Sequence, residues 1–296
     1  MFYTNYSMLV GCHVNREYVP SAGTIAAHIR AARREASSRC GTDLRVVQIF
    51  VGAPRHRKIS LGAAESAELR EYASAENLVV VAHNAYVASP WRGDPDAARY
   101  IREELAACAA AGISGLVVHL PKAPIETVIK YAPYLLNPDA ATVRIYLEIP
   151  AVRPTESYYE TPEKLNELFR RLRQVDPALD VFGLCIDTAH LWTCGVDVSS
   201  RKGAEAWLAG LDAAIIPTDR IILHGNDSLR ARGVGPDAHA PLLEGQMWGE
   251  YASRPSASGL AAFIEYASRH GRPFILERKT KDLLLVDYHT LKKIDI

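Results

Sequence analysis

Residues 78–83 read LVVVAH, a continuous apolar run that ends in a histidine. Five more runs have the same form and end in His, Asp or Glu: GLVVH (115–119), RIYLE (144–148), GLCID (183–187), RIILH (220–224) and PFILE (273–277). Short segments rich in Val, Ile and Leu are typical of strands, and strands that lack polar alternation are covered on both faces. The six runs therefore predict a buried sheet with imidazole and carboxylate groups at one edge.

Strand-like and helix-like segments alternate along the whole chain. Eight strands are expected near residues 8–14, 44–51, 78–83, 115–119, 143–148, 182–187, 220–224 and 273–277. Helical periodicity is present at 24–38, 63–74, 94–111, 125–136, 162–175, 204–214 and 259–270, and again after residue 281. This alternation predicts an α/β fold, a single (β/α)8 TIM barrel over residues 1–296. The rival, an open doubly wound sheet, has one ligand-binding switch point and leaves six polar strand ends unexplained.

Active sites of (β/α)8 barrels lie at the carboxyl ends of the strands, so the six polar strand ends would share one mouth. Two loops add candidates there. DTAH places His190 just after the strand that ends at Asp187, and a connection of about 30 residues after His224 contains Asp237 and His239. The candidate ligands are then His83, His119, Glu148, Asp187, His190, His224, Asp237, His239 and Glu277.

Taken singly, a histidine at a strand end is more often a hydrogen-bonded structural residue than a ligand. Three carboxylates in one mouth, however, would repel one another unless they were protonated, paired or bridged by cations. Imidazole and carboxylate ligands suit zinc or manganese, and the lack of cysteine ligands argues against a closed structural zinc site. Nine groups exceed the need of one tetrahedral ion and indicate two or three ions, an arrangement typical of phosphodiester hydrolysis.

The overall charge points to no partner, because 34 basic residues balance 34 acidic ones. A site for a polyanion must be a local patch, such as the basic loop GAPRHRKIS at 52–60. No apolar stretch reaches the length of a membrane span, and the first residues lack a secretory pattern. We therefore expect a soluble intracellular protein, cytoplasmic or nuclear, that neither binds a membrane nor is secreted. The five cysteines show no paired spacing and predict thiols rather than disulfides.

Seven segments resemble, in order and spacing, the motifs of the endonuclease IV family of apurinic/apyrimidinic (AP) endonucleases. They are VVAHNAYV, GLVVHL, IYLEIP, GLCIDTAHLW, ILHGND, GPDAHAPLLEG and ILER. The resemblance runs from GCHV at 11–14 to the last strand, and GLCIDTAHLWTCGVDVSS is most similar in wording to the branch found in large cytoplasmic DNA viruses. It implies a zinc-dependent DNA repair enzyme on a xylose-isomerase-like barrel.

The resemblance also implies three zinc ions per chain, with manganese as an alternative at one site. The first ion would take His83, His119 and Glu148. The second would take Glu148, Asp187, His224 and Glu277, with Glu148 as the bridge between the two. The third would take His190, Asp237 and His239. Glu148 and Glu277 would also act in catalysis, by orienting the attacking water.

The implied activity belongs to base excision repair. The enzyme would hydrolyse the phosphodiester 5′ to an abasic site in double-stranded DNA and leave a 3′-hydroxyl and a 5′-deoxyribose phosphate. Further 3′-repair and 3′–5′ exonuclease activities are part of the same implication. Arg55 and Tyr86 match positions that contact the DNA, and a monomer without an obligate protein partner is expected. His13 of GCHV is expected behind the ligands rather than among them.

Two positions depart from the family pattern. Gly225 stands where the family usually has a larger apolar residue, which affects local packing. Ala238 stands where a basic residue is common, which removes one phosphate contact. No ligand position is lost.

Two alternatives stay open. A metal-dependent sugar isomerase or epimerase on the same barrel would hold one ion with a Glu, Asp, His, Glu set and would not need the other five candidates. A DNA-binding or metal-storing barrel without catalysis would tolerate broken ligand sets, whereas the nine candidates are all present.

Overall fold

Eight parallel strands close into a TIM barrel, as the sequence predicts, in the computed structural model, which describes residues 9–18 and 23–294. The strands are β1 (Leu9–His13), β2 (Val46–Ile49), β3 (Val79–His83), β4 (Gly115–His119), β5 (Arg144–Glu148), β6 (Phe182–Asp187), β7 (Ile221–His224) and β10 (Pro273–Leu276). Neighbours in the chain are neighbours in the barrel, and β10 pairs with β1 to complete the circle. Residue 8, the expected start of the first strand, lies outside the described residues.

Apolar side chains fill the barrel interior. They come from all strands but one of the eight: Val46, Val81, Val117, Tyr146, Cys185, Ile222 and Ile275, with Leu9 of the remaining strand packed against them. The Tyr146 ring occupies the space beside Gly115 and Gly183, where a Cβ atom would overlap it. Because these side chains pack the interior, a ligand is expected at the mouth, where the active sites of this fold lie.

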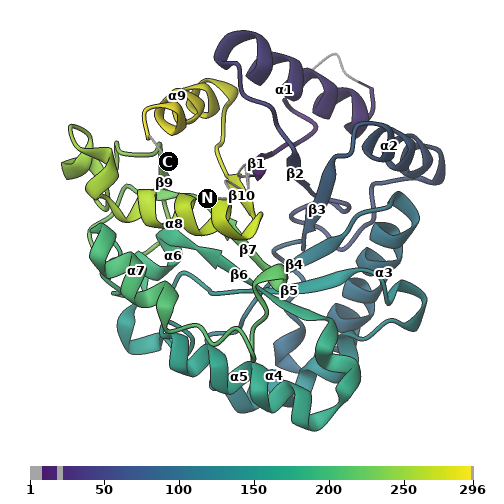
Figure 1. The fold of residues 1–296 in the computed structure, drawn as a ribbon. Helices are drawn as coiled ribbons and strands as arrows, with labels where there is room; N and C mark the ends of the chain where they lie inside the picture. Colours follow the sequence, from purple (N-terminus) through teal and green to yellow (C-terminus); the bar gives the residue numbers. More distant parts are fainter. Residues whose placement is uncertain (1–8, 19–22, 295–296) are drawn as a thin grey trace, which may run out of the picture.

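Helices form a ring around the strands, and α9 lies beside α1 where the barrel closes (Figure 1). They are α1 (Ile25–Cys40), α2 (Ala63–Ala75), α3 (Pro95–Ala111), α4 (Ile125–Tyr131), α5 (Pro162–Val175), α6 (Thr188–Thr193), α7 (Arg201–Ala209), α8 (Gly259–His270) and α9 (Lys281–Lys292). Local sequence sets their ends. In α3, for example, Asp94 accepts a hydrogen bond from Asp96 N, and Gly112 takes the left-handed conformation that ends the helix.

Three helices differ from the expectation. The segment expected at 125–136 is α4 followed by a 3-10 turn, because Pro133 has no N–H to continue the α-helical ladder. The helix expected at 204–214 is α7, which starts after the N-cap Ser200 and stops before Gly210. Helix α6 was not expected, and it forms because the Asp187 side chain caps it.

The long connection after β7 is ordered by a short hairpin of β8 (Asp227–Ser228) and β9 (His239–Ala240). The buried Asp227 carboxylate accepts backbone hydrogen bonds from Ser228 and, farther along the loop, from Gly245, Met247 and Trp248 at 2.7–3.3 Å. The hairpin fixes the part of the loop that carries His239. Over the described residues, no helix combines the length and apolarity that crossing a bilayer requires.

Candidate metal centre

All nine candidate ligands lie at the carboxyl-terminal mouth of the barrel. Five strands, β3 to β7, end in a candidate residue, one candidate follows β10, and α6 and the long loop supply the rest. Ligand atoms fall into groups in which every atom lies within 4.8 Å of the others: His83 with His119 and Glu148; Glu148 with Asp187, His224 and Glu277; and Asp187 with His190 and His239. Expectations from six separate strand ends thus converge on one place.

Glu148 is the centre of the first group. Its Oε2 lies 3.2 Å from His83 Nε2 and 2.8 Å from His119 Nε2, while its Oε1 lies 3.0 Å from His224 Nδ1. Burial alone would raise the pKa of Glu148, but His119 and His224 outweigh it and hold that pKa well below its ordinary value. The carboxylate is therefore charged and joins the first group to the second.

Asp187 and His224 form the second group with Glu277. The two are register partners on β6 and β7, and His224 Nδ1 lies 3.8 Å from Asp187 Oδ2 and 3.4 Å from Glu277 Oε2. Asp187 Oδ1 caps α6 by accepting from Ala189 N and His190 N at 2.8 and 3.1 Å. Because one oxygen is occupied by the cap, the other is left facing the centre.

The third group lies between α6 and the long loop. Asp237 Oδ2 is 3.5 Å from His190 Nε2 and 3.1 Å from His239 Nε2. Asp187 Oδ2 is also near, 3.8 and 3.7 Å from the same two nitrogens, so this carboxylate lies between the second and third groups. His239 Nε2 is buried and has no aligned hydrogen-bond partner among the described residues. A buried nitrogen in this state is suited to a metal ion.

Hydrogen bonds on the far side of the rings decide which nitrogen faces the centre. His83 Nδ1 lies 2.8 Å from Asn84 O, and His190 Nδ1 lies 2.7 Å from Ile149 O. In His224 the far nitrogen is Nε2, 2.9 Å from Gln48 Oε1. An N–H that donates to such an oxygen leaves the other ring nitrogen with a free lone pair, as metal-binding histidines require.

Electrostatics at the centre fit divalent cations. Burial alone would lower the pKa of His190 and of His239, but Asp187 and Asp237 outweigh it and raise both pKa values. Burial alone would raise the pKa of Glu277, but neighbouring imidazoles, chiefly that of His224, outweigh it and lower that pKa to about 2. Protons on the imidazoles of His190 and His239 thus balance neighbouring carboxylates, and bound cations would replace those protons. The donor set suits zinc or manganese.

Sequence reasoning missed Gln48, which lies behind the ligands. It is fully buried, and its Nε2 donates to Glu277 Oε1 at 2.7 Å while its Oε1 faces His224. The signal was a glutamine inside the apolar run VVQI of β2. His13 Nδ1 lies 3.2 Å from Gln48 Nε2, so His13 is placed behind the ligands as expected, and burial lowers its pKa to about 4.

The two expected DNA contacts lie beside the centre on adjoining loops. Tyr86 is 62% exposed, and its ring centroid lies 5.4 Å from that of His83. Arg55 is exposed, and its loop is tied to Tyr86 by a hydrogen bond from Tyr86 N to Pro54 O at 3.0 Å. Cavities of about 460 and 490 Å³ flank the centre, and Tyr86 and Asp237 line both.

Two other basic side chains of the loops, Arg57 and Arg232, are engaged in ion pairs. Arg57 Nη2 lies 2.6 Å from Asp94 Oδ2, and Arg232 Nη1 lies 2.5 Å from Asp197 Oδ2. Both contacts hold loops in place and leave these guanidinium groups less available to phosphates than that of Arg55.

The departure at Gly225 has a packing cause. A Cβ atom at this position would overlap the ring of Phe274 on β10, so the phenyl ring fills the space that a larger residue at 225 would need. At the second departure, Ala238 accepts a hydrogen bond from Leu229 N through its backbone oxygen at 2.8 Å. That contact needs no particular side chain.

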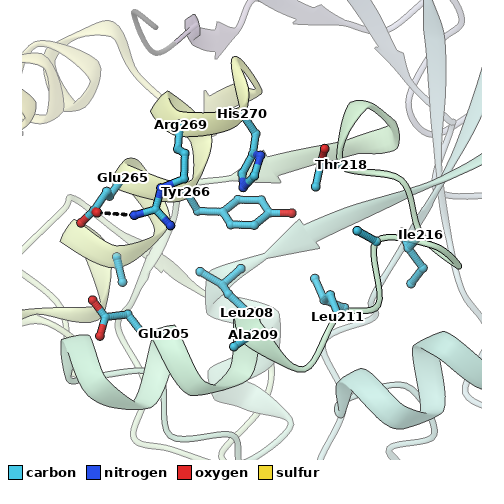
Figure 2. A pocket seen from close by; sticks show the side chains of 12 residues that line it. Glu205, Leu208, Ala209, Leu211, Ile216, Thr218, Glu265, Tyr266, Arg269 and His270 are labelled. Atoms are coloured by element: carbon cyan, nitrogen blue, oxygen red, sulfur yellow. Dashed lines mark hydrogen bonds and ion pairs between the residues drawn. The ribbon is translucent and has the colours of Figure 1, made fainter. Parts of the chain in front are cut away.

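A further cavity of about 510 Å³ lies on the outside of the barrel between α7 and α8 (Figure 2). Tyr266 crosses it above Leu208 and Leu211, and Arg269 and Glu265 pair at one side. None of the nine candidate ligands lines it. This outer cavity is therefore separate from the candidate metal centre at the mouth.

Comparisons with known proteins agree with this geometry. The family model described as a xylose isomerase-like TIM barrel matches residues 35–277. A probable AP endonuclease of African swine fever virus is 37% identical over 260 residues, which cover 83% of this chain and 85% of the viral protein. A probable endonuclease 4 of Methanoculleus marisnigri is 30% identical over 81% of this chain and 84% of its own length.

Solved structures share the fold of this chain. The crystal structure of AsfvAP:AG superposes with a TM-score of 0.91 at 34% identity, over 97% of this chain and 99% of the other. Endonuclease IV from Thermus thermophilus has a TM-score of 0.73 at 24% identity, over 96% and 97% of the two chains. A D-tagatose 3-epimerase-like protein shares the fold, with a TM-score of 0.65 at 16% identity over 97% of both chains.

Proposed function

The chain belongs to the endonuclease IV family of AP endonucleases, which are DNA-cleaving hydrolases, and from that premise we propose that it cleaves DNA at abasic sites. Hydrolysis of the phosphodiester on the 5′ side of the lesion would leave a 3′-hydroxyl and a 5′-deoxyribose phosphate. The observation that carries the proposal is the third group of ligands, His190 and His239 with both Asp187 and Asp237 within 3.8 Å of their Nε2 atoms, beside two groups around Glu148. Multinuclear centres of this kind are typical of phosphodiester hydrolysis.

Three zinc ions would fit the centre. His83, His119 and Glu148 would hold the first; Glu148, Asp187, His224 and Glu277 the second; and His190, Asp237 and His239 the third, with manganese as an alternative at one site. Asp187 is near enough to the third group to share in it. Zinc held by these residues would supply positive charge at the scissile phosphate and would make water a stronger acid.

The side chains of the centre position the reacting groups. Glu148 and Glu277 would accept hydrogen bonds from the attacking water and so orient it toward phosphorus. Gln48 holds Glu277 by one carboxylate oxygen, which leaves Oε2 turned toward His224 and the interior of the site. Orientation of this kind lowers the barrier by fixing the reacting atoms before the reaction begins.

The lesion itself contributes to selectivity. A sugar without a base has no stacking to lose and leaves the duplex at the lowest cost. Tyr86 and Arg55, on the rim, would contact the DNA from which the sugar has turned out. We expect the enzyme in the cytoplasm or nucleus, where it would meet double-stranded DNA with abasic sites. We also expect a monomer, because one chain supplies all nine candidate ligands.

The one-ion sugar isomerase remains the weaker candidate. It would use Glu148, Asp187, His224 and Glu277, but it gives no role to the groups around His119 and Asp237. The likeness to epimerase structures is one of fold alone. No contact at the centre favours a sugar over a phosphodiester.

The test is a duplex that carries one tetrahydrofuran analogue of an abasic site. The analogue has no aldehyde, so a lyase cannot cut it by elimination and only hydrolysis produces a nick. We expect a nick on the 5′ side whose 3′-hydroxyl a DNA polymerase can extend, and no cut in an undamaged duplex of the same sequence. A lack of nicking by the zinc-loaded protein, or nicking that persists after exhaustive chelation, would refute the proposal. Extension of the assay to recessed 3′ ends would reveal 3′-repair and exonuclease activity.

A further inference from the structure

A buried ion pair lies directly behind the metal centre. Arg278 follows Glu277, and its Nε lies 2.6 Å from Asp287 Oδ2 on α9. The side chains are 1% and 0% exposed. The N–H is not aligned with that oxygen, so the contact is an ion pair rather than a good hydrogen bond. Burying two charges is costly unless further contacts satisfy them, so the other contacts of Arg278 and Asp287 matter.

The remaining donors of Arg278 reach two residues that follow β7 and the backbone oxygen of Glu277, which follows β10. Its Nη1 donates to Asn226 Oδ1 at 2.6 Å and to Glu277 O at 2.9 Å. Its Nη2 lies 3.3 Å from Gly225 O. A guanidinium group can only donate hydrogen bonds, so it fixes the oxygen of the Asn226 amide toward itself.

That orientation sends the amide nitrogen of Asn226 toward two candidate ligands. Nδ2 donates to Asp187 Oδ2 at 2.7 Å and to Glu277 Oε2 at 3.1 Å. The opposite orientation would place Oδ1 against both carboxylates, acceptor against acceptor. Glu277 N donates to the same Oδ1 at 3.3 Å, so Arg278 and this backbone N–H together hold the amide with its nitrogen toward both carboxylates.

Asp287 extends the same network to the long loop. Its Oδ1 accepts a hydrogen bond from Leu242 N at 2.7 Å, three residues after His239. The C-terminal helix α9 is therefore linked through one carboxylate to both the second and the third group of ligands. No other described residue that makes an ion pair with an arginine is as deeply buried as Asp287.

We propose that Arg278 and Asp287 are positioning residues for the metal centre, and that they set its metal affinity by fixing the amide of Asn226. The inference rests on the proposed function, because it takes Asp187 and Glu277 as metal ligands. Partners that orient ligating side chains from behind commonly change metal affinity by about 10- to 100-fold when they are removed.

The test is a double-mutant cycle on zinc affinity, measured by competition with a chelator. Asn226→Ala removes the amide. Arg278→Met combined with Asp287→Leu removes both buried charges together, so neither is left unpaired and the protein can keep its fold. A third protein carries all three changes. Leu168→Ala, in the core face of α5, is the control for a loss of stability without a change at the centre.

We expect the zinc dissociation constant to rise about 10- to 100-fold in the Asn226→Ala protein. It should also rise in the protein that combines Arg278→Met with Asp287→Leu. Because the pair acts on the second group through the amide, the triple variant should bind zinc at that group no more than about threefold more weakly than Asn226→Ala alone. The visible spectrum of the cobalt-substituted protein should shift in both variants and stay unchanged in Leu168→Ala.

Wild-type zinc affinity in the protein with Arg278→Met and Asp287→Leu would overturn the inference. Losses of zinc affinity that multiply in the triple variant would also overturn it. Either result would leave the proposed function intact. Failure of the wild-type protein to take up zinc would instead overturn the proposed function, and this inference with it.

Discussion

His119 Nε2 lies 2.8 Å from Glu148 Oε2, and the two residues are register partners on β4 and β5. The Glu148 side chain is 1% exposed, whereas that of His119 is 40% exposed. The pair joins a carboxylate anchored inside the barrel to an imidazole that borders the open mouth. An ion held between them would be fixed by the fold and still within reach of a substrate.

Replacement of His119 should separate catalysis from folding. His119→Ala removes a ligand from a half-exposed position, so nicking of the abasic duplex should fall by about 100-fold or more. The unfolding temperature of the metal-free protein should stay close to that of the wild type, because little buried surface is lost. His270→Ala, on the outer cavity, is the matched control. Wild-type nicking by His119→Ala would remove His119 from the ligand set.

The rim residues should affect DNA binding without changing the metal content. Arg55→Ala should weaken binding to the abasic duplex and lower the slope of log K against log salt concentration by about 1, as expected for one lost phosphate contact. Tyr86→Ala should weaken binding to the abasic duplex more than to the undamaged one. Arg269→Ala removes a positive charge far from the mouth and should leave the slope unchanged. Equal slopes for Arg55→Ala and the wild type would exclude a phosphate contact at Arg55.

Gly225 and Phe274 should be coupled in stability. A methyl group at Gly225 overlaps the Phe274 ring, so Gly225→Ala should lower the free energy of unfolding by about 1–3 kcal/mol. The same change made in a Phe274→Leu background should cost less, because the smaller side chain can move aside. Urea unfolding of the metal-free proteins measures both values. Identical costs in the two backgrounds would show that the ring is not what excludes the methyl group.

Glu104 should make stability depend on pH. This fully buried carboxyl group accepts hydrogen bonds from Asn84 Nδ2 and Ala85 N, and burial raises its pKa from 4.5 to about 7. Between those pH values the folded state binds more protons than the unfolded state, so the contribution of Glu104 to stability falls as pH rises.

Glu104→Gln should remove that dependence. Relative to the wild type, its free energy of unfolding should improve between pH 5 and pH 8, by up to about 3 kcal/mol for the full shift. Unfolding in chelator at each pH measures the difference, and the subtraction cancels every other titrating group. A difference that is constant across this range would mean that Glu104 is ionised in the folded protein throughout.

The strand ends could be predicted because their signal is local. A run such as RIYLE shows both its burial and the carboxylate that ends it, and a closed barrel then brings Glu148 beside His83 and His119 without further information. Helix α6 was missed because Asp187 serves both as strand end and as helix cap. The hairpin in the long loop was missed because it depends on the buried contacts of Asp227 with residues 18–21 positions later.

The residues behind the ligands could not be predicted, because their partners are distant in the sequence. Gln48 meets His224 and Glu277 only after the barrel has closed between β1 and β10. Arg278 and Asp287 pair only after α9 has docked on the barrel. In the sequence, Gln48 appears as one polar residue in a strand, and Arg278 and Asp287 appear as two charges near a helix.

The number of zinc ions per chain tests the central claim most directly, because the third ligand group distinguishes a DNA phosphodiesterase from a one-ion sugar enzyme. Elemental analysis of the purified, zinc-equilibrated protein should give about three ions per chain, and His239→Ala should give about two. One ion per chain in the wild type, unchanged by His239→Ala, would contradict a trinuclear centre.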